Sequence, residues 1–263
     1  MNVANSGRSL RFAALLSVVA LTPQVSNATV VEFQTVLGNF EVNLYDNSTP
    51  QTVLNVLDYV NNGAFTNSII HRSVPGFVIQ GGGFTYDLAL GSVPENPPVI
   101  NEPVFANVRG TIAMAKLGGD PNSATSQWFF NLADNTANLD GQNGGFTAFG
   151  EVVGDGMDVV DAIAALPRFN FSGAFTDLPL RDFSLDDFQN NVDPDETNYA
   201  IITAVIISDS TVDSAAGLNP PLSTNVAPPT NPQPPASGGG GGGSLGVISL
   251  LGLLLARRRR LRC

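Results

Sequence analysis

The fold is decided by one stretch of the sequence, IIHRSVPGFVIQGGGF at residues 69–84. Apolar and β-branched residues lie on both sides of the turn signal Pro75-Gly76, and three glycines follow, which predicts two strands and then a tight turn. Strands of this kind belong in a core, yet this stretch carries Arg72. Burying a guanidinium without a partner costs several kcal/mol, so we expect Arg72 to face a cleft. The alternative is a strand-end Arg72 paired with one of the many acidic residues.

The flanking sequence predicts more short strands and two helices. Residues 29–33 and 40–44 lie around a hairpin signal at 37–39. Apolar residues repeat on one face from Pro50 to Asn62-Gly63, and again over residues 158–166, which predicts two amphipathic helices. Further strands are predicted at residues 111–115, 126–131, 146–153 and 199–208. Many short strands with two helices indicate a closed β-barrel with helices over its ends.

The part of the chain between the two arginine-containing ends is strongly acidic. That middle part holds five of the 12 basic residues and all 23 acidic residues, a net charge of about −18. Such a surface repels phosphate backbones, which argues against nucleic acid as a partner and suits a soluble protein in a salty medium. The only cysteine is Cys263, so no disulfide can form within the chain.

Residues 1–28 have the pattern of a secretory signal peptide. Arg8 and Arg11 form a basic start, residues 12–21 are apolar, and Ser26-Asn27-Ala28 supplies the small residues of a cleavage site. We expect cleavage after Ala28 and export to the periplasm, cell envelope or cell surface. An uncleaved membrane anchor is less favoured, because an apolar run of about ten residues is short of the ~20 that span a bilayer.

The chain beyond residue 210 predicts a linker and a tail. Residues 211–237 are rich in Pro, Ser, Thr and Asn, which favours an extended spacer. Residues 238–263 join six glycines, an apolar run and an arginine cluster that would stay on the cytoplasmic side of a membrane. This order resembles the glycine-rich sorting tails of Gram-negative bacteria, which implies cutting near the glycines by a rhomboid-type intramembrane protease. A plain C-terminal transmembrane anchor is the alternative.

Several motifs of the middle part follow one another in the order and near the spacing of a known family. They are IHRSVPGFVIQGG at 70–82, AMA at 113–115, SQWFF at 126–130, LDG at 139–141, FGEV at 149–152 and GMDVV at 156–160. On these motifs, residues 30–208 resemble a cyclophilin. The resemblance implies that residues 29–210 form an eight-stranded antiparallel barrel capped by two helices. It also implies peptidyl-prolyl cis-trans isomerase activity on proline-containing polypeptides, with no cofactor and no metal.

The implied reaction needs neither a nucleophile nor a proton acceptor. Rotation about a prolyl peptide bond is opposed by resonance, with a barrier of about 18–20 kcal/mol, and no bond breaks. A catalyst has to bind the twisted amide more tightly than either planar form. Arg72 is the candidate catalytic residue, because its permanently charged fork of donors can act on the pyramidal proline nitrogen.

The resemblance also implies eight substrate-binding residues. The proline socket is matched by Phe77, Met114, Phe129, Leu139 and Phe146. Of these, Phe146 takes a position where the family usually has His or Tyr, so the socket is more apolar. Gln80 and Gln127 match the side-chain amides that hold the substrate and position the arginine, and Ala115 matches the residue whose backbone contacts the peptide.

Other departures from the family pattern bear on specificity. Lys116 replaces the familiar Asn, and the loop at 117–125 is longer than in animal cyclophilins, which affects the secondary pocket. Asn138 stands where many eukaryotic members have a tryptophan that binds cyclosporin, so weak cyclosporin sensitivity is implied.

Other kinds of site were weighed against these interpretations. His71, the only histidine, has no partners in the sequence for a triad or a metal site, so a structural role beside the cleft is favoured over acid-base catalysis. The glycines at 81–83 lack the Lys-Ser/Thr of a phosphate loop and indicate a tight turn. The acidic residues between 182 and 196 could bind calcium, but their spacing favours a solvated insertion. The rival function is a binding module or chaperone that holds proline-containing segments without turnover.

Overall fold

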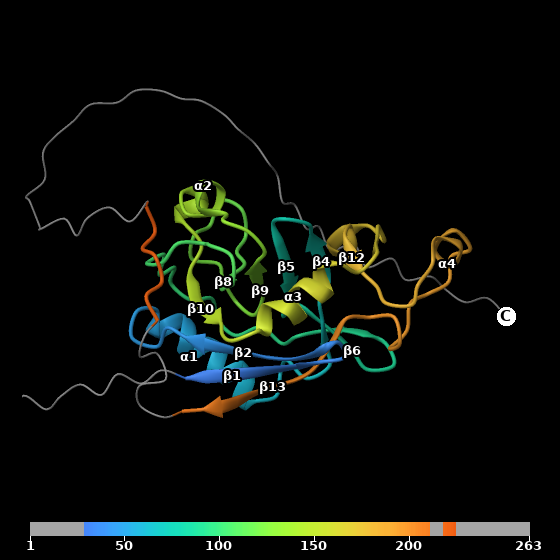
Figure 1. The fold of residues 1–263 in the computed structure, drawn as a ribbon, viewed down its shortest axis with the longest axis horizontal. Coiled ribbons are helices and arrows are strands. Elements are labelled where there is room, and N and C mark those ends of the chain that lie inside the picture. Colours follow the sequence, from blue (N-terminus) through green and yellow to red (C-terminus); the bar gives the residue numbers. More distant parts are fainter. Residues whose placement is uncertain (1–28, 211–217, 225–263) are drawn as a thin grey trace, which may run out of the picture.

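The computed structural model describes residues 29–210 and 218–224, and Figure 1 shows how they fold. The predicted signal peptide and tail, and most of the predicted linker, lie outside the described residues. The strands are β1 (Val30–Thr35), β2 (Gly38–Leu44), β3 (Ser68–Ile69), β4 (Arg72–Val74), β5 (Val78–Gly81), β6 (Phe84–Tyr86), β7 (Leu90–Ser92), β8 (Thr111–Met114), β9 (Trp128–Asn131), β10 (Ala148–Val152), β11 (Arg168–Phe169), β12 (Leu178–Pro179) and β13 (Ile201–Asp209). The helices are α1 (Pro50–Asn61), α2 (Thr136–Leu139), α3 (Gly156–Ala164) and α4 (Leu185–Gln189), with 3-10 turns at Gln142–Gly144 and Gly173–Phe175.

One curled antiparallel sheet dominates the described part of the chain. Its strand order is β4-β5-β9-β8-β10-β2-β1-β13-β3-β6-β7, and β11 pairs separately with β12. Two successive residues connect distant parts of this order: the N–H of Ile70 donates to the carbonyl of Ala200 beside β13, and the N–H of His71 donates to the carbonyl of Gln80 in β5. The predicted mainly β class with few helices is confirmed, whereas the closed eight-stranded form of the barrel is not.

The hairpin and helix predictions are confirmed, with small shifts of their ends. β1 and β2 pair from Val30 opposite Asn43 to Thr35 opposite Gly38. α1 packs against β13, and α3 packs against β2. The N-terminus of α1 is capped from a distance, because the Glu102 carboxylate accepts hydrogen bonds from the backbone N–H and the hydroxyl of Thr52, at 2.9 and 2.8 Å. A carboxylate at this end of a helix stabilises its unpaired N–H groups.

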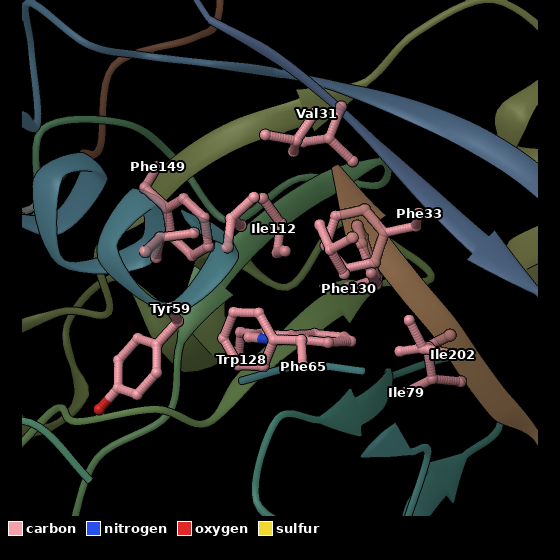
Figure 2. Close-up of a cluster of buried hydrophobic side chains, with 14 of the residues drawn as sticks. Val31, Phe33, Tyr59, Phe65, Ile79, Ile112, Trp128, Phe130, Phe149 and Ile202 are labelled. Atoms are coloured by element: carbon pink, nitrogen blue, oxygen red, sulfur yellow. The ribbon is translucent and has the colours of Figure 1, made fainter. Parts of the chain in front are cut away.

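The main core lies inside the curled sheet and is rich in aromatic rings (Figure 2). Trp128 is fully buried and contacts Phe33, Phe65 and Phe130 edge to face, with ring centroids 5.3 to 6.2 Å apart. Edge-to-face contacts of this kind add to the free energy of apolar burial. Every second residue of β5, β8 and β9 points into this core, which leaves the alternate residues on the opposite face of the sheet.

The insertion at residues 167–198 forms a second apolar core that the sequence interpretation missed. Its acidic side chains are exposed or partly exposed, as expected for a solvated segment. Its apolar side chains, however, pack with one end of the sheet; the buried members of this cluster are Ile69, Phe169, Leu178, Leu180, Phe183, Tyr199 and Ile201. The insertion is therefore a folded extension of the domain, and β12 contacts β4 (Figure 1).

Part of the predicted linker also contacts the domain. In residues 218–224, the carbonyl of Pro221 accepts a hydrogen bond from Ala106 N–H, and Ser223 N–H donates to the carbonyl of Val104, both at 2.9 Å. In the described ranges, 29–210 and 218–224, no helix is long and apolar enough to cross a membrane.

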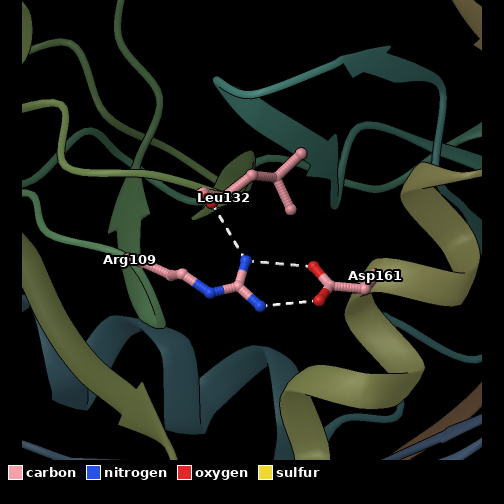
Figure 3. A network of polar contacts seen from close by, with 3 residues as sticks. All are labelled: Arg109, Leu132 and Asp161. Carbon is pink, nitrogen blue, oxygen red and sulfur yellow. Dashed lines mark hydrogen bonds and ion pairs between the residues drawn. The ribbon is translucent and has the colours of Figure 1, made fainter.

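A surface ion pair fastens α3 to the ends of two core strands (Figure 3). Arg109 donates to both carboxylate oxygens of Asp161, at 3.0 and 2.6 Å, and to the carbonyl of Leu132 at 2.9 Å. Both charged side chains are about half exposed. Pairs of this exposure contribute about 0–1 kcal/mol, so the contact sets the position of α3 more than it stabilises the fold.

Candidate active site

One row of residues crosses five neighbouring strands on the face of the sheet that lies away from the main core. Arg72 in β4 lies opposite Gln80 in β5, and Gln80 lies opposite Phe129 in β9. Phe129 in turn lies opposite Ala113 in β8, which lies opposite Ala148 in β10. Directly paired residues of antiparallel strands share a face. The backbone register therefore brings a cation, an amide and an apolar surface into one line.

Side-chain hydrogen bonds connect the polar end of this row. Arg72 Nη1 donates to Gln80 Oε1 at 3.3 Å, and Gln80 Nε2 donates to Gln127 Oε1 at 2.9 Å. All three side chains are partly exposed. The structure thus brings together Arg72, Gln80 and Gln127, which are separated by up to 55 residues in the sequence.

Within the described residues, the guanidinium of Arg72 is hydrogen-bonded to an amide and forms no ion pair. The strand-end salt bridge of the alternative is therefore not observed among residues 29–210 and 218–224. Burial lowers the pKa of Arg72, and the charge of Asp177 opposes that shift. An arginine keeps its charge under such a shift. A half-buried cation whose N–H donors are not bonded to a carboxylate can stabilise the lone pair that develops on the nitrogen of a twisted amide.

An apolar cluster adjoins the polar end of the row. Its buried members are Val78, Ala113, Phe129, Leu139 and Ala148, and its partly buried members are Phe77, Phe105, Ala115 and Phe146. Four of the predicted socket residues, Phe77, Phe129, Leu139 and Phe146, and the predicted contact residue Ala115 therefore lie together. Asn138, which precedes Leu139, is exposed at this end of α2.

Met114 does not join this cluster, which corrects its placement in the proline socket. Its side chain is 1% exposed and packs in the main core. The reason is the two-residue period of a strand: Ile112 and Met114 of β8 point inward, and Ala113 points to the site. Val78 was missed, although it alternates with Ile79 and shares the face of Gln80. That period-two pattern in VIQG could have identified it.

Phe146 is fixed by a neighbouring ring and by a cation. It meets Phe129 at a steep angle, with ring centroids 5.8 Å apart. The ammonium of Lys116 lies 4.7 Å from the centroid of the Phe146 ring and donates to the backbone carbonyls of Asn143 and Gly145. Burial lowers the pKa of Lys116 to about 8, against the opposing charge of Asp120. Lys116 thus ties the segment before Phe146 to the edge of the cluster.

His71 lies beside the site but has the environment of a structural residue. It is 2% exposed and contacts the Phe84 ring edge to face at 5.0 Å. Its Nδ1 has no hydrogen-bond partner among the described residues. Burial, and then the charge of Arg72, lower the pKa of His71 to about 4. The imidazole is therefore buried, and neutral at neutral pH.

The glycine run permits close approach of β9 to the end of β5. Gly82 has φ +75°, and a Cβ there would lie 2.6 Å from the carbonyl oxygen of Ser126. At Gly83 a Cβ would lie 2.8 Å from the side chain of Gln127. These glycines therefore leave the room in which Gln127 reaches Gln80, which agrees with a turn and not with a phosphate loop.

Two of the acidic residues considered for calcium, Asp187 and Asp195, have local structural roles. Asp187 and Ser184 form a capping box at the start of α4, and Asp195 accepts hydrogen bonds from Thr197. In the part of the chain that the structure describes, no group of three or more His, Cys, Asp or Glu residues could hold a metal ion.

Comparisons with known proteins agree with this geometry. Residues 30–184 match the family model described as cyclophilin type peptidyl-prolyl cis-trans isomerase/CLD. The chain is 41% identical over 164 residues to a peptidyl-prolyl cis-trans isomerase of Acinetobacter baylyi, which covers 61% of this chain and 85% of the relative. It is 42% identical over 159 residues to peptidyl-prolyl cis-trans isomerase B of Escherichia coli, which covers 58% and 94%.

A solved structure shares the fold. The crystal structure of a Cryptosporidium parvum cyclophilin type peptidyl-prolyl cis-trans isomerase superposes with a TM-score of 0.50 at 21% identity, covering 70% of this chain and 99% of that chain. The family match, the bacterial relatives and the arrangement of Arg72 beside an apolar cluster lead to one conclusion. The chain belongs to the cyclophilin-type peptidyl-prolyl cis-trans isomerase family.

Proposed function

We propose that the chain is a peptidyl-prolyl cis-trans isomerase that uses Arg72 to accelerate rotation about Xaa-Pro bonds. The observation that carries this function is the row from Arg72 through Gln80 to Phe129, which places a cation beside an apolar surface. A proline ring resting on the cluster of Phe77, Phe129 and Phe146 brings its nitrogen toward the guanidinium.

Arg72 acts by donating to the proline nitrogen as it becomes pyramidal. In the planar amide the nitrogen lone pair is delocalised, so this hydrogen bond gains strength only in the twisted state. Gln80 and Gln127 position the guanidinium and hold the flanking backbone. An acceleration of about 10⁵ requires about 7 kcal/mol, which one charged donor and a restricted geometry can supply.

The test of this function is turnover by the full chain. Exchange spectroscopy on a short peptide with one Ala-Pro bond measures the rates between its cis and trans forms with and without the protein. An isomerase raises both rates at a small molar fraction of protein. A binding module or chaperone, the rival function, shifts and broadens the peptide signals without raising the exchange rates.

The place of action follows from segments outside the described residues. Residues 1–28 have the pattern of a signal peptide and residues 238–263 that of a sorting tail, which supports an exported enzyme that assists folding in the periplasm, envelope or cell surface. In this proposal residues 211–237 separate the isomerase domain at 29–210 from the membrane, and processing proteases release the tail. The acidic surface of the domain repels phosphate backbones, which argues against nucleic acid as a partner. The proposed partners are proline-containing polypeptides.

A further inference from the structure

A cavity of about 290 Å³ lies between the insertion and strands β6 and β7, apart from the row of residues at Arg72. Half of its lining residues are aromatic, and Asp193 is the charged residue among them. The lining residues used in the argument below are Tyr86, Phe171, Phe175, Leu178, Asp193 and Tyr199. An aromatic wall with one carboxylate matches a ligand group that is apolar along its length and positively charged at its end.

The rings of this cavity are held in place by their neighbours. Tyr86 packs on Tyr199 with centroids 4.8 Å apart, and Tyr199 is 3% exposed. Phe171 packs on Phe188 at 5.2 Å. Because Tyr86 and Tyr199 pack on each other within the wall and Phe171 packs on Phe188 behind it, these rings are held before any ligand enters, and little side-chain freedom is lost on binding.

The electrostatic setting favours a cation. Residues 167–198 contain two basic and seven acidic residues. Asp193 itself lines the cavity. Burial, followed by the charges of Tyr86, Asp193 and Asp195, raises the pKa of Tyr199 to about 12. The nearby cation Arg181 is not in the wall; it donates to the backbone carbonyls of Tyr199 and Glu196.

Short contacts connect the cavity with the candidate active site. Phe175 in its wall packs on Phe84 at 4.7 Å, and Phe84 packs on His71, the neighbour of Arg72, at 5.0 Å. The insertion is also hydrogen-bonded to β4, because Ser73 N–H donates to the carbonyl of Asp177 at 2.8 Å. The insertion that forms the cavity and the strand that carries Arg72 are therefore in direct contact.

We propose that this cavity is an accessory subsite that takes a lysine or arginine side chain of the polypeptide substrate, at a position away from the Xaa-Pro bond. The stem of that side chain packs between the rings, and its charge lies beside Asp193. The subsite rests on the proposed isomerase function and defines its substrate class: proline-containing segments with a basic residue at a fixed spacing.

The test uses the full chain and a series of unfolded peptides with one Ala-Pro bond. Each peptide carries one lysine at a different distance on either side of that bond, and matched peptides carry glutamine or leucine instead. KM and kcat are measured by exchange spectroscopy. We expect one spacing at which lysine lowers KM by about fivefold or more relative to both glutamine and leucine, with kcat unchanged.

Two variants and one matched control assign that effect to the cavity. Asp193→Asn removes the charge at an exposed position, and Tyr86→Leu removes a ring. Both are expected to abolish the lysine advantage, whereas Asp186→Asn removes an equal charge from exposed α4 outside the cavity and is expected to keep it. Asp193 is exposed, so we expect Asp193→Asn to fold normally. Its KM values therefore test the subsite even if Tyr86→Leu is unstable.

Three results would overturn the subsite. They are equal KM for lysine and glutamine at every spacing, an equal gain with leucine, and a lysine advantage that survives Asp193→Asn. Failure of the isomerase function gives a different result, since the short peptide without lysine would then show no acceleration. In that case calorimetric titration with the lysine and glutamine peptides still tests binding at the cavity.

Discussion

Arg72 and Gln80 lie directly opposite each other on antiparallel strands, and their side chains are joined by a hydrogen bond of 3.3 Å from Nη1 to Oε1. Gln80 also donates to Gln127, whose side chain occupies the space that Gly83 leaves open. The guanidinium is therefore oriented by neutral amides. A carboxylate would neutralise the guanidinium, whereas an amide orients it and leaves its charge in place. The charge of Arg72 therefore stays available to stabilise a twisted prolyl amide.

The first prediction concerns the apolar cluster beside Arg72 and the proposal that it binds the proline ring. Val78→Ala is expected to raise KM by about fivefold, because it removes two methyl groups from the apolar cluster. Met114→Leu, a swap of similar volume in the main core, is expected to leave kcat/KM within about twofold and to cost less than about 1.5 kcal/mol of unfolding free energy. Steady-state rates and urea denaturation check both. A loss of activity for Met114→Leu with Val78→Ala unaffected would restore the original placement.

The second prediction concerns Lys116. Replacing it with methionine removes the ammonium that bonds the carbonyls of Asn143 and Gly145 and lies over Phe146. The Phe146 ring then loses its fixed position, and KM is expected to rise about threefold with kcat little changed. The wild-type KM is expected to rise as pH increases through about 8, where the lowered pKa removes the charge.

Lys116→Arg is the control for that pH dependence. Arginine keeps its charge above pH 8, so the rise of KM should disappear in this variant. An identical pH profile in the wild type and in Lys116→Arg would exclude Lys116 as its cause.

The third prediction concerns His71 and stability. Its folded pKa of about 4 lies below the unfolded value of about 6.5, so between these values the unfolded chain binds more protons. The free energy of unfolding is therefore expected to fall as pH decreases through this window, by at most about 3 kcal/mol from this residue. Urea denaturation at several pH values measures the loss, which should be smaller in His71→Gln. Equal losses in both proteins would contradict a buried neutral imidazole.

The same assignment predicts the pH dependence of the rate. Because Arg72 does not titrate and His71 transfers no proton, kcat is expected to be flat from about pH 6 to 7.5. A bell-shaped profile that His71→Gln abolishes would count against this mechanism.

The fourth prediction concerns processing. Arginines after an apolar run resist translocation, so the tail is expected to stop in the inner membrane, with the glycines at the outer edge. Glycines have weak helix propensity, which leaves the backbone open to a protease. Intact mass of protein from the native host should show a chain that begins near Thr29 and ends near the glycine run. Recovery of Arg257 to Cys263 in the membrane-bound protein would indicate an ordinary anchor.

The main strands and the two long helices could be predicted because their signals are local, whereas the short β6, β7, β11, β12, α2 and α4 were not predicted. The apolar repeat of α1 and the Pro75-Gly76 turn before β5 depend only on neighbouring residues. The curl of the sheet could not be predicted, since it depends on Ile69 and Ile70 pairing with residues 200–201, which are distant in the sequence. The aromatic residues of the insertion were visible, but they follow no helical or strand period, so nothing local indicated that Phe169 and Phe183 are buried together.

The order of the motifs was enough to predict most of the residues that gather at the candidate site. It was not enough to predict which face of a strand each residue occupies. Arg72, Gln80 and Gln127, which the resemblance implied as parts of one site, are joined by hydrogen bonds, and their roles stay predictions. Met114 was misplaced because the spacing of the motifs does not say which face of β8 a residue occupies. Val78 can be placed at the site only once Gln80 is known to face it, because residues two apart in a strand share a face.

The most direct test of the central claim is the turnover of Arg72→Ala on a short Ala-Pro peptide, with Arg72→Lys beside it. The partly exposed side chain contributes little to folding, so stability and peptide affinity should change little, whereas kcat should fall by about 100-fold or more. Arg72→Lys should fail similarly, because a point charge does not reproduce the fork of donors. An Arg72→Ala variant that keeps near-wild-type kcat/KM would contradict the assignment of Arg72 as the catalytic residue.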